Sequence, residues 1–255
     1  MQPLLPLLAP SLLLAASAAG FRDPGRRPGK VPMIAEAAAL GAFAVALLAA
    51  LLAVNSGPAT SPLIGLLGVG LSVRLDAVSA SMLVLVAFVG WIVVRYTRTY
   101  LDGEERQGLF TAWLTATLAA VLLLVQAGNL VQLVAAWFAS SWCLQRLLLF
   151  YPERVQARRA ARKKALSART GTACLSVGAL LLAWHYGTFD IATILTAART
   201  GESSTILVLA ALLLAAAALL KSAQFPTQGW LTEVMETPTP VSALLHAGLV
   251  NAGGF

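Results

Sequence analysis

The chain has 255 residues, of which 58% are hydrophobic and only 11% are charged. A soluble domain carries about a quarter charged residues, so this composition excludes an ordinary soluble protein and indicates a multi-pass helical membrane protein. The net charge of +7 does not indicate a nucleic-acid partner, because the basic residues cluster between apolar runs, where membrane topology places them.

Apolar runs predict seven membrane spans and the start of an eighth. The seven cover about residues 4–20, 34–54, 77–94, 109–127, 130–150, 172–186 and 205–220. A signal peptide is the alternative for the first run, but its basic residues follow the run instead of preceding it. Residues 66–73 are rich in glycine and predict a short strand or an extended segment before the third span. We therefore expect one all-α membrane domain over residues 1–255, a polytopic transmembrane helix bundle with a discontinuous, proline-broken seventh helix.

The basic residues predict the orientation. Segments 22–30, 95–106 and 146–169 hold 15 of the 18 Lys and Arg residues. Because basic loops stay in the cytoplasm, we expect a protein of the cell inner membrane with its N-terminus outside. Residues 151–170 predict a basic cytoplasmic loop or amphipathic helix on an anionic lipid bilayer. RNA binding is the alternative for this segment, but no aromatic residues interleave with its charges.

The residues that carry chemistry lie near the end of the chain. Lys221 directly follows the seventh apolar run, and Pro226 then interrupts the helix. An ionisable group at membrane depth is costly and usually functional, and broken helices form ion sites in transporters. We therefore predict that Lys221 lies on a proton or ion path. The alternative is that Lys221 extends along the helix to the inner interface.

Four other ionisable residues are candidates for the same path. His246, on the next apolar segment, is predicted to relay protons to Lys221; a histidine hydrogen-bonded to a neighbour is the alternative. Glu233 and Glu236 lie in the intervening loop, where they are either solvated or paired with Lys221 or with another subunit. Asp76 lies at the outer end of the third span, as a solvated or locally paired carboxylate or as an ion-uptake residue.

Two prolines shape the backbone of this stretch, and the lack of catalytic motifs excludes most catalytic chemistry. Pro238 and Pro240 restrict the residues before them and restart the chain ahead of the next helix. Cys143 and Cys174 form neither a disulfide framework nor a metal-ligand spacing. No phosphate-binding loop, catalytic triad, haem motif or iron–sulfur motif is present. We predict no cofactor and no metal in this chain, and no enzymatic activity by itself.

The segment 221–247 resembles the central motif of the antiporter-like proton-translocating membrane subunits. The matching residues are KSAQFP at 221–226, GWL at 229–231 and METPTPVSALLHA at 235–247, with RLDAVS at 74–79 as a further match. This family includes the chain-5-type subunit of NADH:quinone oxidoreductase and the large subunit of multi-subunit Na⁺/H⁺ antiporters. The resemblance implies that Lys221, on a broken seventh helix, passes protons with the help of His246.

Two departures from the respiratory pattern refine this resemblance. The respiratory subunits carry a glutamate after a tryptophan in the fifth span, where this chain has Phe138 after Trp137. The ending HAGLVNAGGF is more similar to the membrane subunit of DAB-type inorganic carbon accumulation complexes. That branch implies coupling of a proton or sodium gradient to a large, zinc-containing, carbonic-anhydrase-like partner.

The resemblance also bears on length and leaves rival functions open. The family is about twice as long and has a second, inverted bundle, so we expect this chain to hold mainly the first bundle. A respiratory NADH:quinone oxidoreductase or Na⁺/H⁺ antiporter subunit is one alternative to the carbon pump. A non-conducting membrane scaffold, suggested by the missing glutamate, is the other. The sequence does not distinguish protons from sodium as the coupling ion.

Overall fold

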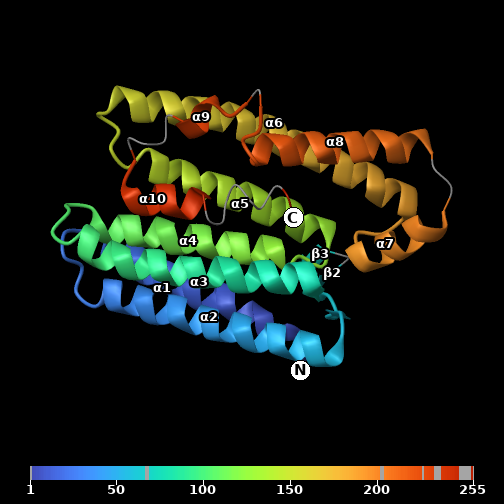
Figure 1. Ribbon diagram of the computed structural model, residues 1–255, viewed down its shortest axis with the longest axis horizontal. Helices are drawn as coiled ribbons and strands as arrows, with labels where there is room; N and C mark the ends of the chain where they lie inside the picture. The colour runs from blue at the N-terminus through green and yellow to red at the C-terminus, as the bar shows by residue number, and fades with distance from the viewer. Residues whose placement is uncertain are drawn as a thin grey trace.

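The computed structural model describes residues 2–66, 69–201, 204–225, 227–232, 237–246 and 254. Its long helices lie side by side in one bundle, and the short strands lie at one end (Figure 1). The predicted all-α polytopic bundle is confirmed. The first half of the chain contains η1 (Gln2–Leu7), α1 (Leu8–Arg22), α2 (Val31–Ser56), α3 (Ala77–Tyr100) and α4 (Gln107–Val125).

The second half continues the bundle and ends in short helices. It contains α5 (Leu130–Leu148), α6 (Val155–Tyr186), α7 (Ile191–Thr200), α8 (Thr205–Lys221), α9 (Gly229–Thr232) and α10 (Thr239–Leu244). Between α2 and α3, β1 (Ala59–Thr60) pairs antiparallel with β4 (Arg74–Leu75), and β2 (Ile64–Leu66) pairs antiparallel with β3 (Val69–Leu71). The strand expected at 66–73 therefore belongs to a small hairpin.

Five helices in the described part are long and apolar enough to cross a membrane: Leu4–Arg22, α2, α3, α4 and α6. The shorter apolar helix α8 packs along α6, and α5 packs between α4 and α6. All seven predicted spans thus fall on helices of the bundle. Large apolar side chains on the outer faces, such as Leu51 and Leu180, are exposed. Such exposure is expected where the surrounding medium is lipid.

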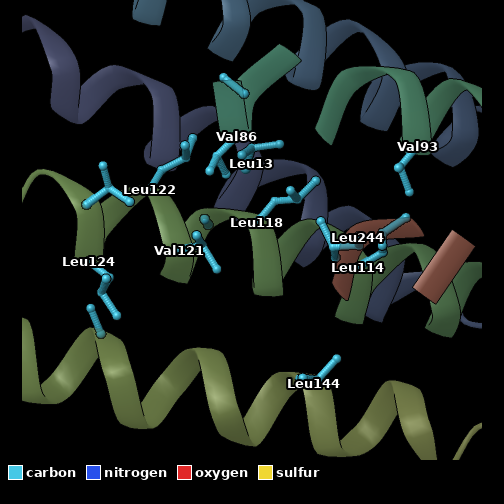
Figure 2. Close-up of a cluster of buried hydrophobic side chains, with 14 of the residues drawn as sticks. Leu13, Val86, Val93, Leu114, Leu118, Val121, Leu122, Leu124, Leu144 and Leu244 are labelled. Carbon is cyan, nitrogen blue, oxygen red and sulfur yellow. The ribbon is translucent and has the colours of Figure 1, made fainter. Parts of the chain in front are cut away.

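The centre of the bundle is α4. In its most apolar window 83% of the residues are buried, against 22–44% in the other four candidate spans. Leu114, Leu118 and Leu122 of α4 lie among side chains of the neighbouring helices, and Leu244 of α10 belongs to the same buried cluster (Figure 2). A helix that is apolar on every side is either covered by neighbouring helices or faces lipid, and α4 is covered by its neighbours.

Small residues allow α1 to approach α4 closely. The Ser17 hydroxyl of α1 donates to the Ala112 carbonyl of α4 at 2.9 Å. A Cβ atom added at Gly20 would lie 2.8 Å from the Gly108 carbonyl, and one added at Gly108 would lie 1.9 Å from the Asp23 carbonyl. Close approach at small residues is a common way to associate helices in membranes.

Loops predicted to lie on the cytoplasmic side meet at one end of the bundle. Arg26 donates to the Gly103 carbonyl at 2.6 Å, linking the α1–α2 connection to the α3–α4 connection. The Tyr151 hydroxyl lies 3.3 Å from the Glu104 carboxylate, which links the α5–α6 connection to the same cluster. These are the left-hand loops in Figure 1. The three basic segments therefore share one end.

Segments predicted to lie outside meet at the opposite end. The Gly128 amide donates to the Ser72 carbonyl at 2.9 Å, and the Leu130 amide donates to the Phe189 carbonyl at 2.9 Å. The hairpin region, the α4–α5 turn and the start of α7 are thereby joined. Helices α1 to α6 consequently alternate in direction along the chain, as the predicted spans require.

The basic segment and the predicted sixth span form one continuous helix. Helix α6 has 32 residues and includes the whole run from Val155 to Tyr186. It ends at Gly187, whose φ of 67° is in the left-handed region that favours glycine at a helix C-terminus. Residues 155–170 are therefore the first part of a long helix of the bundle.

The α1–α4 contact predicts a sensitive position. Gly108→Ala places a methyl group against the Asp23 backbone, and such overpacking costs about 1–3 kcal/mol. We expect a lower melting temperature in detergent, measured by loss of the monodisperse size-exclusion peak after heating. Gly29→Ala is the control, because its new methyl group meets only Asp23 Oδ2 at 3.9 Å. Equal stability of both variants would contradict the close contact.

Candidate functional site

Helix α8 is positioned by α6, and Lys221 is its last residue. A Cβ atom at Gly178 of α6 would lie 3.2 Å from Leu214 of α8, so glycine keeps the two helices close. The Ser167 hydroxyl of α6 donates to the Leu220 carbonyl at 3.0 Å. Because the last carbonyls of a helix lack partners within it, this bond stabilises the end of α8 that carries Lys221.

The Lys221 side chain reaches α5. Its Nζ donates to the hydroxyl oxygens of Ser140 at 2.9 Å and Ser141 at 3.0 Å, and it lies 4.6 Å from the centre of the Trp137 ring. Residues three and four apart on a helix share a face, so Trp137, Ser140 and Ser141 form one binding surface. An ammonium over an aromatic face is attracted electrostatically. Lys221 is therefore held against α5.

A second lysine lies beside this surface. Lys164 of α6 is only 5% exposed, and its Nζ donates to the backbone carbonyl of Ser141. Lys164 and Lys221 line the same cavity of about 20 Å³, together with Trp230 and Leu245 among others. The sequence placed Lys164 within a surface charge run and gave it no role in the site.

The chain turns sharply after Lys221. Ser222 follows the helix as its C-cap, and Ala223 has a positive φ of 50°, which is unusual for a residue with a side chain. The backbone therefore leaves the helix before Pro226, and Pro226 itself lies outside the described residues, as do Glu233 and Glu236. The predicted pairing of these carboxylates with Lys221 stays a prediction.

The two other prolines prepare α10. Pro238 is the N-cap of α10, and Pro240 occupies its first turn, where a missing amide hydrogen costs nothing. Helix α10 brings Leu245 to the lysine cavity. His246 is exposed, and no hydrogen bond between His246 and Lys221 is present among the described residues. The proton relay through His246 stays a prediction.

Asp76 caps α3. Its carboxylate accepts from the amides of Val78 at 3.1 Å and Ser79 at 2.9 Å, and Arg74 lies 3.2 Å from its other oxygen. Burial by itself raises the pKa of Asp76, but the hydrogen bonds from Ser79 and Val78 and the charge of Arg74 outweigh it. The pKa consequently lies below its usual value. Asp76 is thus a locally paired carboxylate.

A larger cavity extends from Asp76 toward the lysine. It measures about 600 Å³ and is lined by Arg74, Asp76 and Ser79 near the start of α3 and by Trp137 on α5. Trp137 also contacts Lys221 through its ring. The indole therefore lies between this cavity and the ammonium group.

Among the described residues, acidic groups are scarce around the two lysines. Phe138, at the position of the respiratory glutamate, is 58% exposed and lines a groove of about 400 Å³ with Lys164 and Arg169. No Asp or Glu of the described residues lines this groove or the small lysine cavity. Within the described ranges, no three His, Cys, Asp or Glu side chains are grouped to hold a metal ion.

Comparison with known proteins decides the family. Residues 127–255 match the family described as "NADH:quinone oxidoreductase/Mrp antiporter, TM", and residues 63–111 match "NADH-Ubiquinone oxidoreductase (complex I), chain 5 N-terminus". The chain belongs to this family. The resemblance inferred from the motif around Lys221 is confirmed.

Two named relatives are inorganic carbon transporter subunits. The probable subunit DabB of Hydrogenovibrio crunogenus is 41% identical over 185 residues, which cover 72% of this chain and 36% of that protein. The probable subunit DabB1 of Halothiobacillus neapolitanus is 37% identical, over 99% of this chain and 45% of that protein. NADH-quinone oxidoreductase subunit L of Escherichia coli is 33% identical, over 75% of this chain and 32% of that protein.

A solved structure has the same arrangement of helices. The Mrp complex of Dietzia sp. DQ12-45-1b matches with a TM-score of 0.79 and 28% sequence identity, over 96% of this chain and 27% of the matched chain. This chain spans less than half the length of each of these relatives. Its multi-pass membrane character follows from the family and from the apolar helices.

The Asp76 cap predicts a stability that depends on pH. The pKa of Asp76 is lower in the folded protein, so its ionised form contributes stability above the unfolded-state pKa and loses it as the pH falls through the folded-state pKa. Removing the cap by Asp76→Ala costs about 1 kcal/mol at neutral pH. We expect the difference in melting temperature from the parent to shrink in acid.

Asp76→Asn is the matched variant for this test. It keeps an oxygen that accepts from the amides but loses the charge that pairs with Arg74. Its melting temperature should lie between those of the parent and Asp76→Ala at neutral pH. A pH-independent difference between parent and Asp76→Ala would show that the charge does not contribute.

Proposed function

We propose that this chain is part of the membrane subunit of an inorganic carbon accumulation complex, in which ion movement through the helix bundle drives uptake. The observation that carries this proposal is the placement of Lys221 inside the bundle, bonded to Ser140 and Ser141, in a chain similar to DabB subunits. An ionisable group at this depth is a candidate ion or proton carrier.

The cavity next to Trp137 supports a route from outside to the lysine. Arg74 and Asp76 lie at its outer end, and the Trp137 ring contacts Lys221 at its inner end. Irregular backbone and water-filled space are tolerated within a membrane where protein surrounds them. In this proposal ions or protons enter beside Asp76, reach Lys221, and leave toward His246.

The proposed energy-coupling partner is a zinc-containing, carbonic-anhydrase-like protein. Two relatives are named as probable subunits of inorganic carbon transporters, and a subunit works with at least one partner chain.

The basic segments gather at the end of the bundle that carries Arg26 and Tyr151. Because basic loops remain in the cytoplasm, we place that end inside the cell, the N-terminus outside, and the protein in the inner membrane.

A respiratory or antiporter subunit is the second candidate. The fold similarity to the Mrp complex and the identity to subunit L support it. In that case the same lysine would move protons during exchange or electron transfer, without hydration of carbon dioxide. Co-purification separates the two: a zinc-containing partner supports the carbon pump, and dehydrogenase or antiporter subunits support the alternative.

Replacing the lysine tests the transport role. In the complete complex, Lys221→Ala removes the carrier and its bonds to Ser140 and Ser141. We expect bicarbonate accumulation by cells that depend on the complex to fall at least about tenfold, because alanine can carry neither a proton nor a charge. A tenfold loss corresponds to about 1.4 kcal/mol. Uptake of labelled inorganic carbon, with and without an imposed proton or sodium gradient, is the measurement.

Lys163→Ala is the control, because Lys163 is an exposed lysine of α6. It should leave uptake near the parent level, with equal amounts of assembled complex in both variants. His246→Ala tests the relay separately. Full uptake in Lys221→Ala would exclude the transport role, whereas full uptake in His246→Ala alone would exclude only the relay.

A further inference from the structure

The small cavity between α5, α6 and α8 concentrates positive charge. Lys164 and Lys221 both line it, and both ammonium groups donate to Ser141, one to its carbonyl and one to its hydroxyl. No Asp or Glu of the described residues lines it. Lys164 is buried and Lys221 is partly buried. Two like charges in a medium of low dielectric repel strongly, and an uncompensated buried charge is costly.

The cavity also holds hydrogen-bond donors without acceptors. An ammonium has three N–H donors; in the described part of the chain Lys164 uses one, on Ser141, and Lys221 uses two, on Ser140 and Ser141. Trp230 lines the same cavity at 5% exposure, and its buried Nε1–H has no hydrogen-bond partner there. Buried donors normally have acceptors, so this set is short of an acceptor.

From these two observations we infer that the cavity binds a small monovalent anion, chloride or bicarbonate, between Lys164 and Lys221. A single anion reduces the repulsion between the ammonium groups and accepts hydrogen bonds from both lysines and from Trp230. Loss of a proton from one lysine would reduce the repulsion too. The neutral amine would then offer only one lone pair, which can accept from only one of the unpaired donors of the other lysine and Trp230.

The size of the cavity suits such an ion. Its volume of about 20 Å³ is slightly more than the ~10–15 Å³ needed for one water molecule. A halide is close to water in size. Bicarbonate is larger, so its binding requires the lysine side chains to move apart. The inference concerns binding and does not depend on ion conduction by the bundle.

Bromide provides the test, because it is a halide that quenches tryptophan fluorescence on contact. The Trp137 ring packs on Lys221, and Trp230 lines the cavity. In the protein reconstituted into lipid nanodiscs, without any gradient, we expect quenching by sodium bromide to include a saturable component above the linear collisional background. Sodium gluconate at equal ionic strength should not produce it.

Variants assign the saturable component to the cavity. Lys164→Met removes one ammonium with little change in volume, and we expect bromide affinity to fall at least about tenfold, as for loss of a hydrogen bond to a charged group. Lys164→Arg keeps the charge and should keep saturable quenching. Lys163→Met is the matched control on the exposed side of α6. Monodisperse elution of each variant verifies folding.

Competition at constant pH identifies the natural ion. Displacement of bromide by chloride alone identifies a chloride site, and displacement by bicarbonate identifies a bicarbonate site. Purely linear quenching in the parent would overturn the inference; a carboxylate from Glu233 or Glu236 occupying the cavity gives that result. Saturable quenching that survives Lys164→Met, or that neither anion displaces, would overturn it too. Because no transport is measured, these outcomes are independent of the Lys221→Ala uptake result.

Discussion

Polar groups at membrane depth must find their partners inside the protein, and this constraint shapes the bundle. The hydroxyl groups of Thr97, Thr111 and Thr115 donate to carbonyls one turn earlier in their own helices. Gln132 of α5 links its own helix to α4 and to the segment after β3, because its side chain accepts from the Ser72 amide and donates to the Leu123 carbonyl. Lys221 obeys the same constraint through the serines of α5. Most of the polar side chains of these helices therefore donate or accept hydrogen bonds, either to a neighbouring element or within their own helix.

Two of the exceptions among the described residues lie at the candidate site. Trp137 and Trp230 have buried indole N–H groups without partners in the part of the chain that the structure describes. Trp137 borders the larger cavity, and Trp230 borders the small one. An unsatisfied buried donor costs about 1–3 kcal/mol, so such groups are rarely retained without a ligand or water. These two indole donors thus lie in the same region as Lys164 and Lys221.

The membrane spans and Lys221 could be predicted from the sequence, because each leaves a simple pattern of apolar and charged residues. Apolar runs located the spans, because lipid-facing and buried positions in such helices are both apolar. Lys221 was found because it interrupts an apolar run. Lys164 was missed because arginines and lysines flank it. The signal was nevertheless present, since small residues share its face at helical spacing: Ala157, Ala160, Ala161, Ser167 and Gly171. The serine pair of α5 was missed because serine is common in membrane helices and gains meaning only when a lysine from α8 reaches it.

Helix α6 is long and continuous, so its two ends are connected rigidly. Its 32 residues extend about 48 Å at 1.5 Å per residue, whereas the hydrocarbon layer is about 30 Å thick. The helix is therefore several turns longer than the layer is thick, and Lys164 lies in its first half. Because α6 is one continuous helix, a displacement of its Val155 end along the helix axis would also displace Lys164, which donates to the Ser141 carbonyl of α5. Contacts made by the Val155 end of α6 would thus be connected mechanically to Lys164, which is only 5% exposed.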